Sequence, residues 1–144
     1  MKNLLICSIL CVSLFSCSKS NNVDRNCNYL LNVAVNTSVN MSLPQYSQLQ
    51  FISNSVYVPN AGNKGIIVMN TGTGFMAWDA ADPNHSPNTC STLEIVGGTE
   101  GVCGCEDANK YSLFTGQPLE NPELRCGLKN YRVEVSGNNL LISN

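Results

Sequence analysis

The sequence predicts a small all-β domain, an antiparallel sandwich or barrel, and three observations support this fold class. Short runs rich in β-branched and aromatic residues alternate with clusters of glycine and asparagine, which is typical of strands joined by tight turns. No long segment has the apolar spacing of an amphipathic helix. The chain has 144 residues, the length of one domain, and 43% of them are hydrophobic, enough for a packed core.

The N-terminus has the features of a bacterial lipoprotein signal peptide. Lys2 precedes an apolar stretch over residues 4–15, which is too short to span a bilayer. The sequence Leu-Phe-Ser-Cys then ends at Cys17 and resembles a lipobox, in which the cysteine receives lipid and becomes the mature N-terminus. Ordinary secretion, with Cys17 unmodified, is the alternative.

This leader divides the chain into three parts. We expect a signal peptide, a flexible tether and a β domain, over residues 1–16, 17–28 and 29–144. The protein would then be lipid-anchored in the bacterial cell envelope, either facing the periplasm or in the outer membrane. Its expected partners are the membrane, through the N-terminal lipid, and a protein of the envelope.

The first half of the β domain contains two expected strands and one irregular crossing. Residues Leu30–Val35 alternate weakly and contain valines, so we expect a strand there. Residues Leu43–Leu49 suit a helical turn or an extended crossing. Residues Ser55–Val58 form the second expected strand, which Pro59 ends because proline cannot donate to a ladder.

The central part of the domain predicts a hairpin and one further strand. Residues Gly65–Met69 are a continuous apolar run typical of a buried strand, and Asn70–Gly74 is a turn cluster. Residues Phe75–Trp78 supply the answering strand, and we expect Trp78 to pack in the core beneath the loops. Residues Thr92–Val96 are the next strand, closed by two glycines.

The C-terminus predicts the clearest hairpin. Residues Tyr131–Val135 alternate between apolar and polar side chains, as in a half-buried strand. Residues Ser136–Asn139 supply a turn, and residues Leu140–Ile142 form the second strand of the hairpin.

Disulfides are expected in the mature domain. Of eight cysteines, Cys7 and Cys11 leave with the signal peptide and Cys17 takes lipid, so an odd number remains. The envelope is oxidising, and two disulfides with one free thiol is the simplest arrangement. The remaining cysteines are Cys27, Cys90, Cys103, Cys105 and Cys126.

The spacing leaves the pairing of these cysteines open. A bridge from Cys27 to Cys126 would close a loop of about 100 residues and stabilise the fold by about 4–5 kcal/mol. Cys90 paired with Cys105, or with Cys103, would close a shorter loop worth about 3 kcal/mol. The alternative is that some of these thiols hold a metal.

Composition and motifs exclude several function classes. Charged residues are only 12% of the chain and the net charge is −2, so nucleic acid is not an expected partner. The single histidine, His85, has no recognisable nucleophile motif for a hydrolase. The glycine-rich turn at residues 70–74 lacks the lysine of a phosphate-binding loop. We therefore favour a protein that is not an enzyme.

The segment from residue 82 to residue 118 resembles the Rieske-type ferredoxin domain. In that family a strand ends in C-x-H, a second loop carries C-P-x-H, and an aromatic segment with a glycine follows. Here the three corresponding stretches are residues 81–85, 102–106 and 111–118. The hairpin over residues 128–142 also looks like the family's closing hairpin, so the resemblance covers most of the β domain.

The resemblance implies where a [2Fe–2S] cluster would sit, because a Rieske centre is held by two thiolates and two neutral imidazoles. The first cysteine of the family falls on Asp82, and its histidine falls on Asn84 or, with a slip of one residue, on His85. The second cysteine falls on Cys103, a match, and the second histidine falls on Glu106, a mismatch. One histidine cannot supply two imidazoles, so a standard cluster is excluded in one chain.

The same resemblance implies a disulfide and a list of metal candidates. Quinol-oxidising members bridge their two loops with a further cysteine pair, which Cys105 and, from a displaced position, Cys90 would supply. Aspartate and glutamate are hard oxygen donors that replace soft ligands poorly. The candidate metal ligands are Asp82, His85, Cys103, Cys105 and Glu106.

These observations predict a cell-envelope lipoprotein with a Rieske-like domain whose cluster ligands are mostly replaced. We expect it to be a non-catalytic structural or binding module without a cofactor. One alternative is an electron-transfer protein with a nonstandard [2Fe–2S] cluster. The second alternative is a mononuclear metal-binding module. For His85 the simplest interpretation is a solvated loop residue, and for Asp82 it is the start of a turn.

Overall fold

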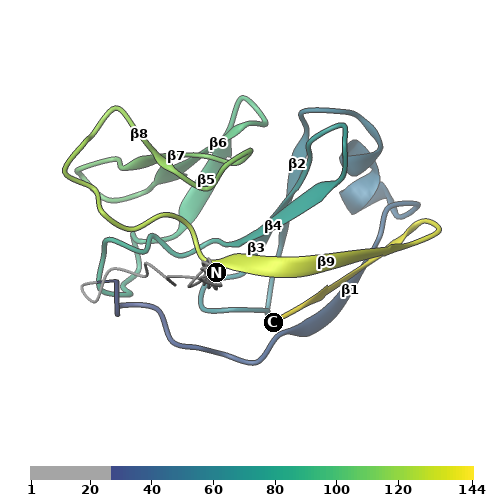
Figure 1. The fold of residues 1–144 in the computed structure, drawn as a ribbon, viewed down its shortest axis with the longest axis horizontal. Coiled ribbons are helices and arrows are strands. Elements are labelled where there is room, and N and C mark those ends of the chain that lie inside the picture. The colour runs from purple at the N-terminus through teal and green to yellow at the C-terminus, as the bar shows by residue number, and fades with distance from the viewer. Residues whose placement is uncertain (1–26) are drawn as a thin grey trace, which may run out of the picture.

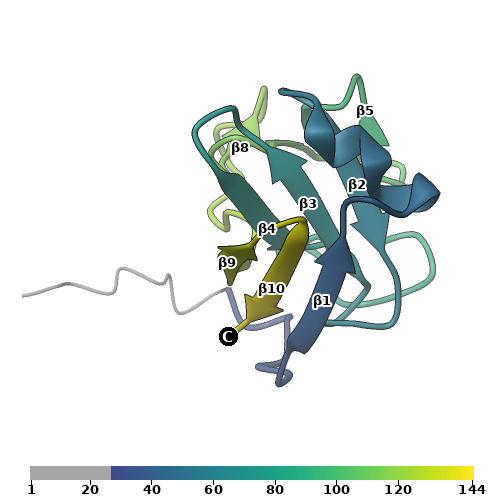
Figure 2. The same cartoon turned by 90° about the vertical axis from the view of Figure 1, so that its right-hand side faces the viewer.

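The computed structural model describes residues 27–144, which fold into two antiparallel β-sheets (Figures 1 and 2). The predicted signal peptide, Cys17 and most of the expected tether lie outside the described residues. Within the described part, no helix has the length and apolar character needed to cross a membrane. The prediction of an all-β domain is confirmed.

The larger sheet has six strands in the order β1-β10-β9-β4-β3-β2. They are β1 (Asn36–Asn40), β2 (Ser55–Val58), β3 (Ile66–Asn70), β4 (Phe75–Asp79), β9 (Asn130–Ser136) and β10 (Asn139–Ser143). The predicted C-terminal hairpin forms between β9 and β10, where Leu140 faces Val135 across the ladder. The predicted hairpin of β3 and β4 is also present.

The smaller sheet has four strands in the order β5-β6-β7-β8. They are β5 (Leu93–Val96), β6 (Glu100–Cys103), β7 (Lys110–Ser112) and β8 (Pro118–Leu119). Figure 1 shows this sheet beside one end of the larger sheet. The chain between β4 and β5 joins the two sheets, and an antiparallel bridge between Ala81 and Thr92 pins its two ends together.

Strand β3 lies between two hydrophobic cores. All four of its apolar side chains are fully buried, as expected for a continuous apolar run. Ile66 and Val68 belong to the core of the larger sheet, whereas Ile67 and Met69 belong to the core shared with the smaller sheet. This division follows from the alternation of side chains along a strand. It explains why the run shows no polar position.

Trp78 lies in the core beneath the smaller sheet, as predicted. Its side chain is 4% exposed, and its indole nitrogen donates a 2.7 Å hydrogen bond to the carbonyl of Leu113. Gly116 sits against the ring in a left-handed conformation, with φ at 71°. A Cβ at this position would approach the ring to 2.6 Å, so only glycine lets the backbone pass so close.

The N-terminal half of the domain differs from the prediction in one place and agrees with it in another. Residues Leu30–Val35 are not a strand, and β1 begins one residue later at Asn36, so that prediction is wrong. The segment Leu30–Val35 is held instead by side chains, such as the Asn144 amide that accepts from the Val35 N–H. The segment expected as a helical turn or crossing is a 3-10 helix, η1 (Pro44–Gln50).

Candidate functional site

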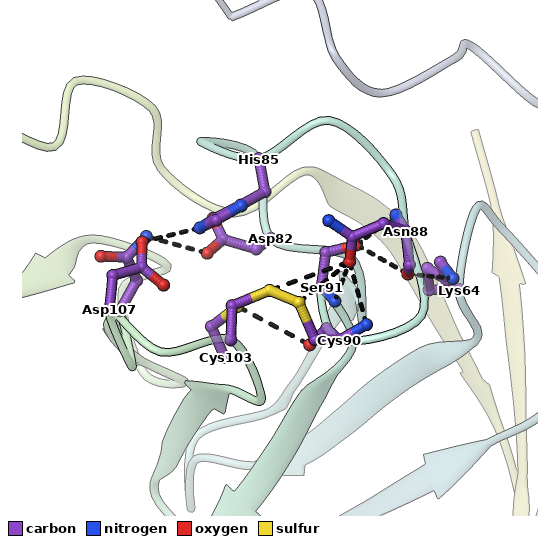
Figure 3. The surroundings of a disulfide bond; sticks show 10 residues. Lys64, Asp82, His85, Asn88, Cys90, Ser91, Cys103 and Asp107 are labelled. Carbon is purple, nitrogen blue, oxygen red and sulfur yellow. Dashed lines mark hydrogen bonds and ion pairs between the residues drawn. A yellow bond between two sulfur atoms is a disulfide. The ribbon is translucent and has the colours of Figure 1, made fainter.

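Two loops meet at one end of the smaller sheet and form the candidate site (Figure 3). The first loop covers residues 80–92 between β4 and β5, and the second covers residues 104–109 between β6 and β7. A disulfide between Cys90 and Cys105 joins them, with an S–S distance of 2.00 Å. Gly104 permits this closeness, because a Cβ there would lie 2.8 Å from the carbonyl oxygen of Cys90.

Asp82 is fully buried where the resemblance places the first cluster cysteine. Its carboxylate accepts hydrogen bonds from the Tyr111 hydroxyl at 2.5 Å, the Asn109 amide at 3.0 Å and the backbone N–H of Asn84 at 2.8 Å. A buried carboxylate needs such partners, because an unpaired one is costly to desolvate. Burial and the bond to Asp82 raise the pKa of Tyr111, so this hydroxyl stays a donor.

Asn84 ties the first loop to a third segment of the chain. Its amide donates to the Tyr111 hydroxyl and to the Cys126 carbonyl, both at 2.8 Å, and its side-chain oxygen accepts from the Cys126 N–H at 3.2 Å. Cys126 is itself bonded to Cys27, with a Cα–Cα distance of 5.6 Å. The start of the described chain is therefore fastened beside the first loop.

A second buried carboxylate, Asp79, supports the base of the first loop. It is fully buried at the end of β4 and accepts hydrogen bonds from the Tyr131 hydroxyl at 2.6 Å and the Ala81 N–H at 3.0 Å. It also accepts two bonds from Asn63, one from the backbone and one from the side chain, each at 2.8 Å. Its role is structural, because it is saturated with donors.

Cys103 is the one free cysteine among the described residues, and it is buried at the end of β6. Burial raises the pKa of its thiol to about 12, and the nearby Asp82 carboxylate adds to the effect. The thiol is therefore protonated at neutral pH and is a poor nucleophile in the absence of a metal.

His85 and Asp107 face each other across the gap between the loops, as Figure 3 shows. The imidazole Nε2 lies 2.6 Å from the Asp107 carboxylate, and the two side chains are 26% and 44% exposed. One ligand atom each from His85, Cys103, Cys105 and Asp107 lie within 4.8 Å of one another. Two soft sulfur atoms, an imidazole and a carboxylate thus share one corner of the site.

The structure brings together three of the five candidate metal ligands. His85, Cys103 and Cys105 lie in this group, whereas Asp82 points into its own hydrogen-bond network and Glu106 is exposed. Both disulfides are among the pairings that the sequence left open.

Sequence reasoning missed several residues of the site. Asp107 had a usable signal, since it is an acid two residues after Cys105 in the loop that carries C-x-C. Tyr111 and Asn109 had none, because nothing local marks them as partners of a carboxylate that precedes them by more than 25 residues.

The donor set does not fit a [2Fe–2S] cluster. A Rieske centre needs two thiolates and two imidazoles, whereas the described loops offer the Cys103 thiol and a single histidine. Asp82 takes the place of the missing thiolate, and its oxygens are already occupied by three donors. Binding iron there would require breaking these buried bonds for a poorly matched oxygen ligand.

Comparison with known proteins gives relatives by fold only. No family model matches the chain, and no curated protein matches it well enough to count as a relative. Ten chains of solved structures match. One is the ferredoxin of carbazole 1,9a-dioxygenase from Nocardioides aromaticivorans IC177, with 14% identity, a TM-score of 0.48, and coverage of 76% of this chain and 96% of that one.

Two others have similar values. A complex of reduced oxygenase and oxidized ferredoxin in carbazole 1,9a-dioxygenase matches with 15% identity and a TM-score of 0.49, covering 78% of this chain and 94% of that one. A protein proposed to be the small subunit of an NADH-dependent nitrite reductase from Mycobacterium tuberculosis matches with 18% identity and a TM-score of 0.46, covering 78% and 97%. At such identities the likeness concerns the path of the chain alone.

The features of this chain itself agree with the expected fold. Two loops meet at one end of the smaller sheet, a cysteine pair bridges them, and β9 and β10 form the C-terminal hairpin. The resemblance to the Rieske-type ferredoxin domain implies each of these features. The chain therefore has a Rieske-like all-β fold.

Proposed function

We propose that this chain is a lipid-anchored protein of the bacterial cell envelope, whose Rieske-like domain holds no [2Fe–2S] cluster and serves as a non-catalytic structural or binding module. One observation carries the proposal: the first cluster position is a buried carboxylate saturated with three hydrogen bonds. A polar network that is fully satisfied rigidifies a structure. The Asp82 carboxylate in this network is already engaged and is not available as a ligand for iron.

The disulfides support the compartment. Two of them are present among the described residues, and such bonds persist in oxidising environments outside the cytosol. The lipobox at Cys17 supplies the anchor. Replacing Cys17 with alanine should move the protein from the membrane fraction to the soluble fraction of the envelope, and unchanged partitioning would contradict the lipid anchor.

The absence of a cluster is tested on protein purified without oxygen. We expect a colourless sample with much less than one iron per chain. A matched positive control is the triple variant Asp82→Cys, Asn84→His and Glu106→His, which completes the family's ligand set around Cys103. If the variant gains visible absorption and the native chain does not, the replaced ligands are the cause. A native chain with two irons and sulfide would overturn the proposal.

A second candidate function is a mononuclear metal-binding module. The observation that favours it is the group formed by His85, Cys103, Cys105 and Asp107, whose ligand atoms approach one another within 4.8 Å. This group overlaps only in part with the four positions that the resemblance assigns to a cluster. It shares Cys103 and, in the slipped alignment, His85, whereas Cys105 and Asp107 are not cluster positions. Elemental analysis of the purified protein separates the two candidates, because a single zinc or iron per chain selects the second.

A further inference from the structure

We propose that the disulfide between Cys90 and Cys105 controls a mononuclear metal site. Its reduction frees the Cys105 sulfur, and Cys105 then binds a divalent ion of the zinc type together with His85, Cys103 and Asp107. The inference rests on the second candidate function and adds to it the metal class and the condition for binding.

The geometry of the four side chains suits a tetrahedral ion. Their ligand atoms all lie within 4.8 Å of one another. Zinc bonds of about 2.0–2.3 Å place the ligands of a tetrahedral site about 3.3–3.8 Å apart. The longest separations in the group must therefore shrink by about 1 Å, whereas the His85–Asp107 pair, at 2.6 Å, must move apart to hold an ion between them. Side-chain rotations of His85 and Asp107, which are partly exposed, can supply these movements.

The proposed site has one buried side and one side that is open to solvent. Cys103 is 3% exposed and forms the inner wall. The His85 and Asp107 side chains are 26% and 44% exposed, so they line the side open to solvent. Their hydrogen bond is replaced by two bonds to the metal when an ion enters. Cysteine thiolate, histidine imidazole and aspartate carboxylate are all ligand types that zinc binds in proteins.

The disulfide determines how many ligands are ready. While Cys105 is bonded to Cys90, its sulfur carries no thiolate, and only three donors remain. After reduction the set becomes two thiolates, one imidazole and one carboxylate. Soft thiolates select zinc over magnesium or calcium, which prefer oxygen ligands. The oxidised protein is therefore a weak site, and the reduced protein is a complete one.

The two disulfides differ in access to a reductant. Cys90 is exposed, whereas Cys126 in the other bridge is 5% exposed. A dithiol, either a small molecule or a thiol-disulfide exchange protein, attacks one sulfur of the accessible bridge and releases the other as a thiol. Its second thiol completes the exchange, so the dithiol becomes a disulfide and two cysteine thiols form. Zinc then displaces one proton each from Cys103 and Cys105.

The first loop keeps its shape when the bridge opens. Asn88 accepts hydrogen bonds through its side-chain oxygen from the N–H groups of Cys90 and Ser91, at 2.9 and 3.0 Å. Its own N–H donates to the Ser91 hydroxyl at 3.0 Å. Lys64 donates to the Asn88 carbonyl at 2.7 Å. These bonds hold the turn independently of the disulfide, so His85 stays near the second loop.

The experiment measures zinc affinity on the full chain by competition with a chromophoric chelator. Four samples are compared: the oxidised protein, the protein reduced with a phosphine, the variant Cys90→Ser, and the double variant Cys90→Ser with Cys105→Ser. The single variant frees Cys105 without a reductant. The double variant loses the same disulfide and every other cysteine is unchanged, so it isolates the Cys105 ligand.

We expect the single variant and the reduced protein to bind one zinc about 100-fold more tightly than the oxidised protein and the double variant. Loss of a residue that only hydrogen-bonds to a metal ligand already weakens metal affinity by about 10–100-fold, and Cys105 is a direct ligand. Cobalt added in place of zinc should show thiolate-to-metal absorption from two thiolates in the single variant. Adding His85→Ala to the single variant should weaken binding by about tenfold or more. Near-ultraviolet circular dichroism checks that each variant is folded.

Equal affinity of the single and double variants, or of the oxidised and reduced protein, would overturn the inference. If Cys90→Ser does not fold, the comparison of oxidised with reduced native protein decides. This result is independent of the iron measurement, because a bound [2Fe–2S] cluster refutes the proposed function, whereas weak zinc binding by an iron-free chain refutes the metal site alone.

Discussion

The stability given by each disulfide should follow the length of chain that it closes. Cys27 and Cys126 are 99 residues apart in sequence, and Cys90 and Cys105 are 15 apart. A disulfide stabilises the fold by reducing the conformational entropy of the unfolded chain. On this account the stabilisation is about 4.7 kcal/mol for the longer loop and about 3.1 kcal/mol for the shorter one. Replacing both cysteines of the longer loop with alanine should therefore cost about 1.6 kcal/mol more than the same change in the shorter loop.

Urea unfolding followed by fluorescence measures this difference. The chain has one tryptophan, Trp78, which is 4% exposed and lies between the sheets, so its emission reports on the shared core. A Cys103→Ala variant is the matched control, because it removes a buried thiol without opening a loop. Complete reduction of the protein in urea is a second measurement, since unfolding exposes both bridges and they open without any substitution.

The test is which of the two double-alanine variants loses more unfolding free energy. If the shorter bridge costs as much as the longer one, or more, loop closure does not set the stability. Native contacts at the end of the smaller sheet would then account for most of the stability that the shorter bridge gives, and the entropic reasoning would be refuted.

Three further changes test separate parts of the structure. Tyr111→Phe removes a buried hydroxyl that donates to a buried carboxylate, and we expect a loss of about 1–3 kcal/mol in the free energy of unfolding, measured in urea. Gly116→Ala places a Cβ 2.6 Å from the ring of Trp78 at a residue with φ at 71°, so it should cost about 2–4 kcal/mol and shift the tryptophan emission, whereas Gly74→Ala, with nothing within 4 Å of its Cβ, should cost less than about 0.5 kcal/mol. Burial and a hydrogen bond to the Asp79 carboxylate raise the pKa of Tyr131 above the ordinary tyrosine value of 10.0. The folded state holds this proton more tightly than the unfolded state, so the resulting stability is complete below pH 10 and is lost as the pH rises further. The difference in unfolding free energy between the native protein and Tyr131→Phe should therefore shrink above pH 10 in an alkaline titration, and a constant difference would contradict this assignment.

The fold was predictable where a strand's own sequence determines its burial. β3 has a continuous apolar run because both of its faces are covered, and β9 alternates because one face is exposed. β1 could not be predicted, since Asn36–Asn40 is mostly polar and becomes a strand only because β10 offers its edge. β6 was missed for a similar reason: Gly101 weakens it as a strand, yet a Cβ there would press on Leu93 and Leu113 at 3.4 Å.

The site was predictable only in part. The cysteines and His85 are marked by their chemistry and by the spacing of the two loops. The buried network around Asp82 is not, because its donors Tyr111 and Asn109 come from a strand and a loop later in the chain. Long-range hydrogen bonds of this kind have no local pattern. The same Asp-Pro dipeptide that suggests a turn is also a fully buried acceptor.

The position of the Cys27–Cys126 bridge also decides how the domain resists mechanical load. β1 lies at the edge of the larger sheet and is paired on one side only, with β10. A pull applied through the chain ahead of Cys27 meets the covalent bridge before it reaches β1, and the force passes to the segment around Cys126. The edge strand is thereby spared from being unzipped one hydrogen bond at a time. Opening this bridge should make the domain yield at a lower force, starting from β1.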